Sequence, residues 1–478
     1  MARLLKTRLI SPYQHDGLRW LAERESDPNH PGGFLCDEMG LGKTVQMLAV
    51  MCVNPTRTLV VVPKSIVSQW RDEIKKFAPH LSVCVFDGAK RVLTDADVTI
   101  APYSVLPTRT GMPVCPLLRV QWGRVILDEG HEIRNRRSKT HIAACALYGA
   151  IRWIVTGTPV FNSMADFVAL CGFLGHNRKD VQAIPDSYRQ LYVLRRTKAD
   201  VAKYNPRLEL PPCDFENLEL EMYDEEFDLY HEVYERAQGV IRNIMNSGNQ
   251  GMHQMELLEA LMRTRQVMTW PQAYLNGIAA QSKTAPDEWK GRSKKMEVLF
   301  DSITAHPTEK SLVFCNFIGE MDEIQRRLGD RTVFRIDGSV DKATRDSSIA
   351  AFTASSEAQD APRPAPVFLI QIKAGGVGLN LQAATRVYIT APSWNPATEL
   401  QAIARAHRTG QTKKVVVRRL VYIGSDSVPS IEQSIMGLQA GKAALSAELL
   451  KDPRLLDQIQ NATKTKLNIR TLKKIFSV

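Results

Sequence analysis

The segment GGFLCDEMGLGKTVQMLAVMCV, residues 32–53, decides the fold class, because it joins a short apolar run, a glycine-containing turn and a helical pattern. A strand, a turn and a helix in this order direct backbone N–H groups and the positive end of a helix dipole at one point, which suits a phosphate chain. We therefore expect a nucleotide to contact this turn, at Asp37, Gly40, Leu41, Gly42, Lys43 and Thr44.

The residue types of the turn also indicate roles. The two glycines let the backbone approach a phosphate closely, and Lys43 can reach the β- and γ-phosphates of ATP. The hydroxyl of Thr44 can bind Mg²⁺. Asp37 stands where such loops usually begin with glycine, so the general pattern is matched only in part.

A second element supplies two carboxylates. An apolar run at residues 124–127 leads directly into Asp128 and Glu129, which are followed by Gly130 and His131. Adjacent carboxylates at a strand end suit phosphoryl transfer, since Asp128 can hold the metal while Glu129 orients and deprotonates the attacking water. Together with the glycine turn, this order of motifs predicts ATP hydrolysis with Mg²⁺.

Short apolar runs recur along the chain in two groups. The first group comprises residues 58–62, 98–101, 125–127 and 153–155, and the second comprises residues 312–314, 333–336, 367–370, 387–389 and 415–417. Helix-length segments lie between the runs, and this alternation favours layers of parallel strands and helices. The sequence therefore predicts an α/β protein with two parallel-sheet lobes in tandem.

The region between the two groups has a different character. It contains the acidic stretch LELEMYDEEFDLYHEVYERA and a second helical pattern, MELLEALMRTRQVM, without strand-like runs. We interpret it as a helical insertion. The expected domains are a first lobe at residues 1–205, the insertion at 206–300, a second lobe at 301–440 and a basic helical tail at 441–478.

The composition narrows the class of protein. The chain of 478 residues carries 62 Lys and Arg against 51 Asp and Glu, and this net charge of +11 suggests a polyanionic partner. The eight cysteines form no CxxC pair and have no His at metal-ligand spacing, so we expect no zinc site. No run approaches 18 apolar residues, so we expect no membrane-spanning helix.

Two arginines in the second group could complete an ATP site. The run QAIARAHR places Arg405 and Arg408 three residues apart, which on a helix would put both side chains on one face. Guanidinium groups at a γ-phosphate stabilise the charge of the transition state. The neighbouring segment KAGGVGLNL, residues 373–381, favours this inter-lobe role over a pair of solvated arginines.

In their order, these motifs resemble the Swi/Snf-type family of superfamily-two helicase-like ATPases over nearly the whole chain. The resemblance rests on DEMGLGKT, DEGH, ISPYQHDGLRWL, LVVVPKSIVSQWRDEIKKF, IVTGTPVFNSMADF, IKAGGVGLNLQAATRVYI and SWNPATELQAIARAHRTGQ. It implies two RecA-like lobes and an ATP-driven translocase that contacts the backbone of double-stranded DNA without strong sequence preference. Nucleosomes and other DNA-bound proteins are candidate targets.

The resemblance also implies roles for single residues. It implies that Gln14 recognises the adenine base, and that catalysis depends on Lys43, Asp128, Glu129, Arg405 and Arg408. Coupling between the lobes is expected from His131, Thr156, Gly157, Thr158 and Gln401. Contacts with DNA are expected from Lys64, Ser65, Gln69, Tyr103, Lys373, Gly375 and Gly376.

Four residues depart from the family's pattern, namely Ser11, Gln371, Ile372 and Ala391. They bear on coupling or on the grip on DNA rather than on ATP turnover, because the hydrolysis residues are intact. The helical run SIEQSIMGLQAGKAALSAELL is expected to brace the first lobe, and the basic tail after it to dock on the protein.

Two other functions stay open at this point. A strand-separating helicase would share both hydrolysis motifs, and a catalytically silent DNA-binding scaffold could keep the same fold. The sequence leaves open the object that is remodelled and the host. The location would be the nucleus in a eukaryotic cell, and otherwise the site of viral or bacterial DNA.

Overall fold

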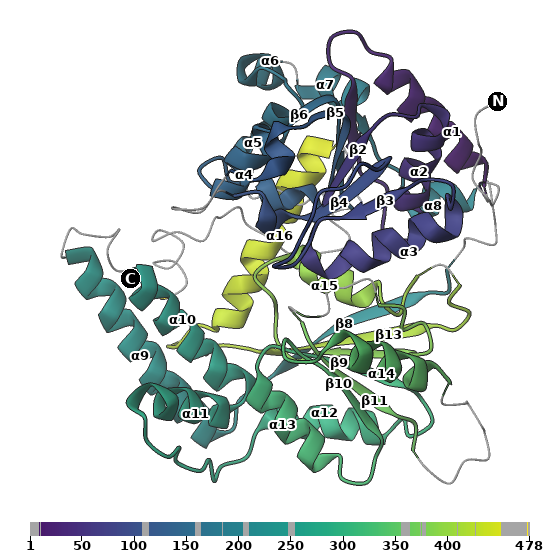
Figure 1. Cartoon of the computed structure of the whole chain (residues 1–478). Helices are drawn as coiled ribbons and strands as arrows, with labels where there is room; N and C mark the ends of the chain where they lie inside the picture. Colours follow the sequence, from purple (N-terminus) through teal and green to yellow (C-terminus); the bar gives the residue numbers. More distant parts are fainter. Residues whose placement is uncertain are drawn as a thin grey trace. The chain divides into compact units, whose positions relative to one another are not determined.

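The computed structural model describes residues 9, 11–107, 114–157, 164–183, 185–203, 210–246, 254–354, 364–372, 374, 379–408, 410–425, 427–450 and 476. The chain forms two compact units, one of residues 1–210 and 445–455 and the other of residues 211–444 and 456–478. Each unit contains one sheet of parallel strands with helices around it (Figure 1), which confirms the expected α/β fold with two parallel-sheet lobes.

The first unit contains a seven-stranded sheet in the order β3-β4-β2-β5-β6-β1-β7. Its strands are β1 (Gly32–Leu35), β2 (Thr58–Val62), β3 (Val83–Val85), β4 (Val98–Pro102), β5 (Gln121–Asp128), β6 (Tyr148–Val155) and β7 (Val193–Leu194). Its helices are α1 (Pro12–Glu25), α2 (Lys43–Val53), α3 (Val67–Phe77), α4 (Lys139–Cys145), α5 (Met164–Phe173), α6 (Arg178–Ala183), α7 (Pro185–Tyr192) and α8 (Lys198–Ala202). Short 3-10 helices are η1 (Lys64–Ile66), η2 (Tyr103–Val105), η3 (Pro116–Arg119) and η4 (Gly130–Ile133).

Strand β2 shows why this sheet forms. Its sequence TLVVV is buried at every position, as a parallel strand covered on both faces should be. Leu59 and Val61 belong to one apolar cluster, whereas Val60 and Val62 belong to another, because successive side chains point to opposite faces. Since all strands run the same way, the residues that follow them meet at one edge, which we call the carboxyl edge of the first sheet.

The second unit contains a six-stranded sheet in the order β10-β11-β9-β12-β13-β8, again with parallel pairs. Its strands are β8 (Cys213–Leu220), β9 (Ser311–Cys315), β10 (Val333–Ile336), β11 (Val367–Gln371), β12 (Arg386–Ile389) and β13 (Val415–Tyr422). Its helices are α9 (Asp224–Asn246), α10 (Gln254–Thr269), α11 (Pro271–Ser282), α12 (Lys294–Thr304), α13 (Ile318–Arg327), α14 (Lys342–Ala354), α15 (Pro396–Ile403) and α16 (Ile431–Leu450). The last of these continues beyond the second unit's boundary at residue 444.

Strand β8 corrects the domain organisation expected from the sequence. It lies inside the region interpreted as a helical insertion and pairs with β13 along its full length, from Cys213 beside Val415 to Leu220 beside Tyr422. As an edge strand it has a mixture of exposed and half-buried side chains and none that is buried, so it lacks the continuous apolar run used to find the other strands. The structure therefore assigns residues 211–300 to the second unit rather than to a separate domain.

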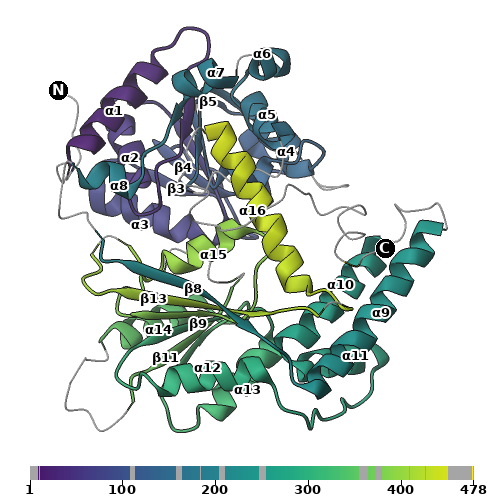
Figure 2. The ribbon, with the colours of Figure 1, turned by 180° about the vertical axis from the view of Figure 1, so that it is seen from behind.

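Helices α9, α10 and α11 pack together within the second unit, as both views show (Figures 1 and 2). Their shared apolar cluster includes Tyr234 and Leu261, together with Ile431 and Ile435 from the start of α16. Phe476 is fully buried in the same cluster, with its ring 5.2 Å from that of Tyr234. The docking expected for the tail is thus confirmed at this residue.

Two further expectations concern absences. All eight cysteines are free thiols, and the described residues contain no group of three or more His, Cys, Asp or Glu side chains that could hold a metal ion. Within the same residues, no helix has the length and apolar character needed to cross a membrane.

Candidate nucleotide-binding and catalytic site

The expected phosphate-binding turn lies between β1 and α2, at the carboxyl edge of the first sheet. Gly40 (φ 91°) and Gly42 (φ 73°) both occupy the left-handed backbone region that glycine favours. Gly42 is the N-cap of α2 and provides no side-chain cap, which leaves N–H groups of the first turn available to an anion. The ammonium of Lys43 donates to the carbonyl oxygens of Asp37 at 2.9 Å and Glu38 at 3.4 Å, so it folds back over the turn.

Helix α1 borders this turn. A methyl group added to Gly42 would lie 2.8 Å from the amide nitrogen of Gln14, so the side chain of Gln14 adjoins the N-cap of α2. The hydroxyl of Tyr13 donates to the carbonyl oxygen of Leu41 at 3.0 Å, and both residues are buried. Thr44 is half-buried in the first turn of α2. The structure thus places the side chain of Gln14 beside the turn.

The carboxylate of Asp37 has partners within the protein. Its carboxylate is fully buried and accepts hydrogen bonds from the backbone N–H of Arg196 at 3.1 Å, from Nε of Arg196 at 3.0 Å and from Nε2 of Gln46 at 3.1 Å. The guanidinium of Arg196 completes an ion pair with it. Because these partners occupy it, the carboxylate of Asp37 anchors the turn to α2 and to Arg196.

Arg196 is a residue of the site that sequence reasoning missed. Besides Asp37, it hydrogen-bonds Gln46 at 2.7 Å and the carbonyl of Tyr13, and its guanidinium lies 5.2 Å from the Tyr13 ring. It therefore joins α1, the turn and α2. The sequence signal for Arg196 was its position in the LRRTKADV segment. That segment has no local pattern that indicates a contact with a residue 159 positions away.

The two predicted catalytic carboxylates lie at the end of β5. Asp128 accepts hydrogen bonds from the indole N–H of Trp70 at 2.7 Å and from the backbone N–H of Glu129 at 2.9 Å. Burial and the neighbouring charge of Glu129 raise the pKa of Asp128 to about 6. A cation beside Asp128 would offset both effects, so this end of the strand suits a divalent ion.

Glu129 has a strained backbone. Its φ of 50° places it in the left-handed region, which residues other than glycine rarely adopt and which clusters at functional sites. Its carboxylate lies 3.4 Å from Nδ1 of His131 and accepts a hydrogen bond from the hydroxyl of Thr156 at 3.3 Å. Burial lowers the pKa of His131, but the hydrogen bond and charge of Glu129 outweigh this effect and raise it overall.

Gly157 connects these groups to the phosphate-binding turn. A methyl group on Gly157 would lie 2.8 Å from Nζ of Lys43 and 2.5 Å from Cγ of Met39, so the backbone must approach the lysine closely here. Thr156 and Gly157 follow β6. Thr156 contacts Glu129, and Gly157 lies beside Lys43. Thr158, predicted with them, lies outside the described residues.

The candidate DNA contacts fall into three sets. Lys64, Ser65 and Gln69 are exposed and follow β2 at the carboxyl edge of the first sheet. Tyr103 is buried instead, and its hydroxyl donates to the carbonyl oxygen of Asp128 at 2.8 Å. The expectation that its side chain contacts DNA is therefore wrong, because that side chain supports the catalytic strand. Those in the second lobe, Lys373, Gly375 and Gly376, lie outside the described residues.

The arginine motif of the second unit differs from the expected helix. Helix α15 ends at Ile403, so Arg405 and Arg408 lie in the turns that follow it rather than on one helical face. The backbone carbonyl of Arg405 accepts a hydrogen bond from Leu381 at 3.0 Å, and the guanidinium of Arg408 donates to the carbonyl of Leu379 at 3.4 Å. The arginine motif thus contacts the described end of the KAGGVGLNL segment. Gln401 lies half-buried on α15.

The residues that depart from the family's pattern occupy packed positions. Ser11 is buried and is the N-cap of α1, while Ile372 and Ala391 are buried in the second unit. Gln371 is half-buried at the end of β11. None of these four side chains is exposed, so each substitution bears on packing around a motif.

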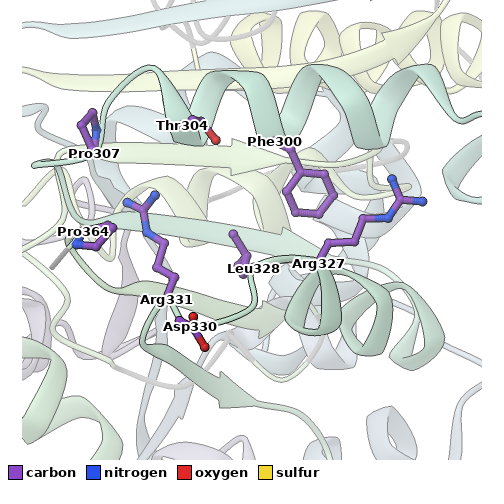
Figure 3. Close-up of a pocket in the computed structure, with 8 residues that line it drawn as sticks. All are labelled: Phe300, Thr304, Pro307, Arg327, Leu328, Asp330, Arg331 and Pro364. Atoms are coloured by element: carbon purple, nitrogen blue, oxygen red, sulfur yellow. The ribbon is translucent and has the colours of Figure 1, made fainter.

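A hollow of about 980 Å³ in the second unit is unrelated to this chemistry (Figure 3). Its lining includes Phe300 of α12, Arg327 of α13, and Arg331 and Pro364, which precede β10 and β11. Those two residues mark the amino ends of parallel strands, whereas the motif residues follow the carboxyl ends. The hollow therefore lies away from the second unit's motif edge.

Comparisons with known proteins identify two sequence families. Residues 13–184 match the SNF2-related domain, and residues 294–410 match the helicase conserved C-terminal domain. The second match begins at the first residue of α12, well inside the second unit, which starts at residue 211.

Several known proteins are similar over most of the chain. A protein of Orgyia pseudotsugata multicapsid polyhedrosis virus named "Probable global transactivator" is 28% identical over 98% of this chain and 94% of its own length. The mouse SWI/SNF-related matrix-associated actin-dependent regulator of chromatin subfamily A member 1 is 29% identical over 95% of this chain. The ISWI chromatin-remodeling complex ATPase ISW2 of Saccharomyces cerevisiae is 28% identical over 96%. The chain spans only 44% of the length of each of these two cellular relatives.

Among solved structures, the Sulfolobus solfataricus SWI2/SNF2 ATPase core in complex with dsDNA is 26% identical. The match covers 99% of this chain and 98% of that one, with a TM-score of 0.40. The fold class stated above rests on the two parallel sheets rather than on this likeness.

Proposed function

Because the chain belongs to the SNF2 family of helicase-like, DNA-dependent ATPases, we propose that it moves along duplex DNA as it hydrolyses ATP, and so remodels or displaces what is bound there. One observation carries the proposal. Glu129 contacts Thr156, and the next residue, Gly157, lies beside Lys43. These residues lie at the same sheet edge at which Lys64 and its neighbours are exposed. A site for hydrolysis and a surface for phosphates thus share one edge.

In the proposed reaction, Glu129 accepts a proton from the water that attacks the γ-phosphorus, and the bond from that phosphorus to the β–γ bridging oxygen breaks. The hydrogen bond from Thr156 and the contact with His131 hold the carboxylate of Glu129 in one orientation. Lys43 exchanges the carbonyl oxygens of Asp37 and Glu38 for phosphate oxygens. Gln14 contacts the adenine.

Thr44 and Asp128 are the residues that would hold Mg²⁺. The raised pKa of Asp128, caused by burial and by the charge of Glu129, fits a site completed by a cation. The ion supplies charge that neutralises the phosphate oxygens.

The second unit contributes cations to the same reaction in this proposal. Arg405 and Arg408 stabilise the negative charge of the transition state, and Gln401, His131, Thr156, Gly157 and Thr158 couple hydrolysis to movement. Arginines in this role contribute roughly 10³ to 10⁵ to the rate in related chemistry. Their loss should therefore lower kcat far more than it weakens nucleotide binding.

Contacts with DNA are proposed to go to the backbone. Exposed Lys64, Ser65 and Gln69 suit phosphate oxygens, which carry no sequence information. Lys373, Gly375 and Gly376 are proposed as their counterparts in the second unit. The names of the cellular relatives support chromatin as one setting, so nucleosomes and other DNA-bound proteins are the proposed targets.

An ATPase assay with no DNA, single strands, duplex DNA or nucleosomes tests the proposal. We expect duplex DNA to stimulate turnover more than single strands do. Glu129→Gln should abolish the stimulated activity while duplex binding remains. A chain that binds duplex but shows no turnover that Glu129→Gln removes would be a scaffold instead.

A second assay separates translocation from strand separation. A translocase displaces the third strand of a DNA triplex but leaves the duplex paired, whereas a helicase separates the duplex. Triplex displacement with ATP, without strand displacement, is the expected result, and the reverse result would contradict the proposal.

A further inference from the structure

A loop rich in positive charge directly follows the catalytic carboxylates. Residues 132–139 read EIRNRRSK, and we call Arg134, Arg136, Arg137 and Lys139 the basic loop. Arg136, Arg137 and Lys139 are exposed, and Arg134 is half-buried. Glu132 is the single carboxylate in this stretch. Within the described part of the chain, none of the four cations forms an ion pair, so their charge is available to an external anion.

The backbone of the basic loop is held in place by its own contacts. Ile133 is buried, and its carbonyl oxygen lies 2.6 Å from Nδ1 of His141 on α4. Oδ1 of Asn135 accepts from the backbone N–H of Arg137 at 3.1 Å, and Ser138 donates to the carbonyl of Asn135 at 2.8 Å. A backbone that is already ordered loses less entropy when its side chains bind a ligand.

The sheet places this loop beside other proposed DNA contacts. Strands β2 and β5 are neighbours, with Val61 paired to Leu127. Lys64 follows β2 and the basic loop follows β5, so both reach solvent from adjacent strands at the carboxyl edge. Duplex DNA presents closely spaced phosphates, about one charge per 1.7 Å of helix axis, and therefore suits several neighbouring cations.

The loop is also joined to the catalytic residues by a short path. Only the single turn of η4 separates Glu129 and its strained backbone from Arg134. A duplex bound at the loop would therefore act within a few residues of the carboxylate that activates water. Other exposed cations of the first unit, such as Arg178 and Lys179 on α6, have no such connection.

We propose that the basic loop is a binding site for the phosphodiester backbone of duplex DNA, in addition to the contacts already assigned. The inference rests on the proposed function, since it takes duplex DNA as the ligand. Arg136 and Arg137 are its principal contacts, because both are exposed and a guanidinium can bind a phosphate with two hydrogen bonds.

The test is a titration of ATPase activity with a duplex of random sequence at several salt concentrations. The variant Arg136→Ala/Arg137→Ala loses two phosphate contacts. We expect its half-saturating duplex concentration to rise roughly tenfold or more near 0.1 M salt. The slope of log affinity against log salt should fall by about two, since each phosphate contributes about 0.9.

Arg178→Ala/Lys179→Ala is the matched control, because it removes the same charge from two exposed positions of the same unit. It should keep the wild-type half-saturation and slope. Arg136→Lys/Arg137→Lys should keep most of the slope, because the charges remain. Melting temperatures of all variants check that each is folded.

The titration distinguishes a failure of the basic-loop proposal from a failure of the proposed function. If wild-type turnover does not respond to duplex DNA, the proposed function fails. If wild type responds but the alanine variant and the control shift the titration equally, the basic loop is not a DNA site and the proposed function stands.

Discussion

Strand β5 carries a charged side chain at Arg124 and another at its last residue, Asp128, and the two charges have different surroundings. Near the start, Arg124 pairs with Glu25 of α1 at 2.5 Å, and neither side chain is exposed. Trp153 donates to the same carboxylate at 2.9 Å, and Thr58 accepts from Arg124 at 3.0 Å. Every charge at this end therefore has an opposite charge and hydrogen bonds within the protein.

At the other end, Asp128 and Glu129 place two carboxylates side by side. The hydrogen-bond donors to Asp128 are an indole and a backbone N–H, which carry no net charge. Burial beside Glu129 raises the pKa of Asp128 to about 6. The comparison shows that the charge of Arg124 is neutralised within the protein, whereas two carboxylates crowd each other at Asp128, the kind of perturbed group that clusters at functional sites.

The largest expected effect is on catalysis. Glu129→Gln removes the proposed base and one of the two crowded charges, so turnover with duplex DNA should fall by roughly 10² to 10⁴. The melting temperature should stay the same or rise, because a repulsion is removed. Steady-state ATPase assays and thermal unfolding measure both quantities. A clear loss of stability without loss of turnover would contradict a catalytic role for Glu129 and a repulsion between its carboxylate and that of Asp128.

Breaking the ion pair at the other end should have the opposite pattern. Arg124→Ala leaves the Glu25 carboxylate buried without its cation, and the expected cost is about 3 to 5 kcal/mol in the free energy of unfolding. Chemical denaturation measures this cost. The double variant Glu25→Gln/Arg124→Met removes both charges and should recover part of the loss, and an equal loss would mean that packing rather than charge is responsible.

A third prediction concerns the close approach at Gly157. The methyl group of Gly157→Ala would displace the ammonium of Lys43, which lies 2.8 Å from the position of the new carbon. We expect kcat to fall by up to about 100-fold, since small displacements of catalytic groups are costly. Gly172→Ala, at a position with open space, is the control. Comparable activity of the two variants would argue against a role for this contact.

The smallest effect is expected for Tyr103→Phe. The variant loses one hydrogen bond to the carbonyl of Asp128, which should cost about 0.5 to 1.5 kcal/mol of stability. Its half-saturating duplex concentration should match that of wild type, because the hydroxyl is buried. A weaker affinity for duplex in a DNA titration would restore Tyr103 as a DNA contact.

Much of the fold could be predicted from the sequence where the signal is local. The apolar runs at residues 58–62 and 367–370 lie within β2 and β11, because strands covered on both faces must be apolar along most of their length. The edge strand β8 was missed, since half of its surface is polar and its pairing with β13 joins residues about 200 positions apart. Strands that are buried along most of their length were therefore the easiest to predict from the sequence.

By itself, the sequence determined the order of the motifs and the chemistry that they can perform, because glycine turns and strand-terminal carboxylates act through residues adjacent in the chain. Only the tertiary structure decided which acidic residues remain for that chemistry. Asp37 belongs to the phosphate-binding turn in sequence, yet Arg196 occupies its carboxylate from 159 residues away. Among the described residues, the hydrogen-bond donors to Asp128 are an indole and a backbone N–H, and no guanidinium pairs with its carboxylate. The physical reason is that the state of a buried charge depends on what the fold places beside it.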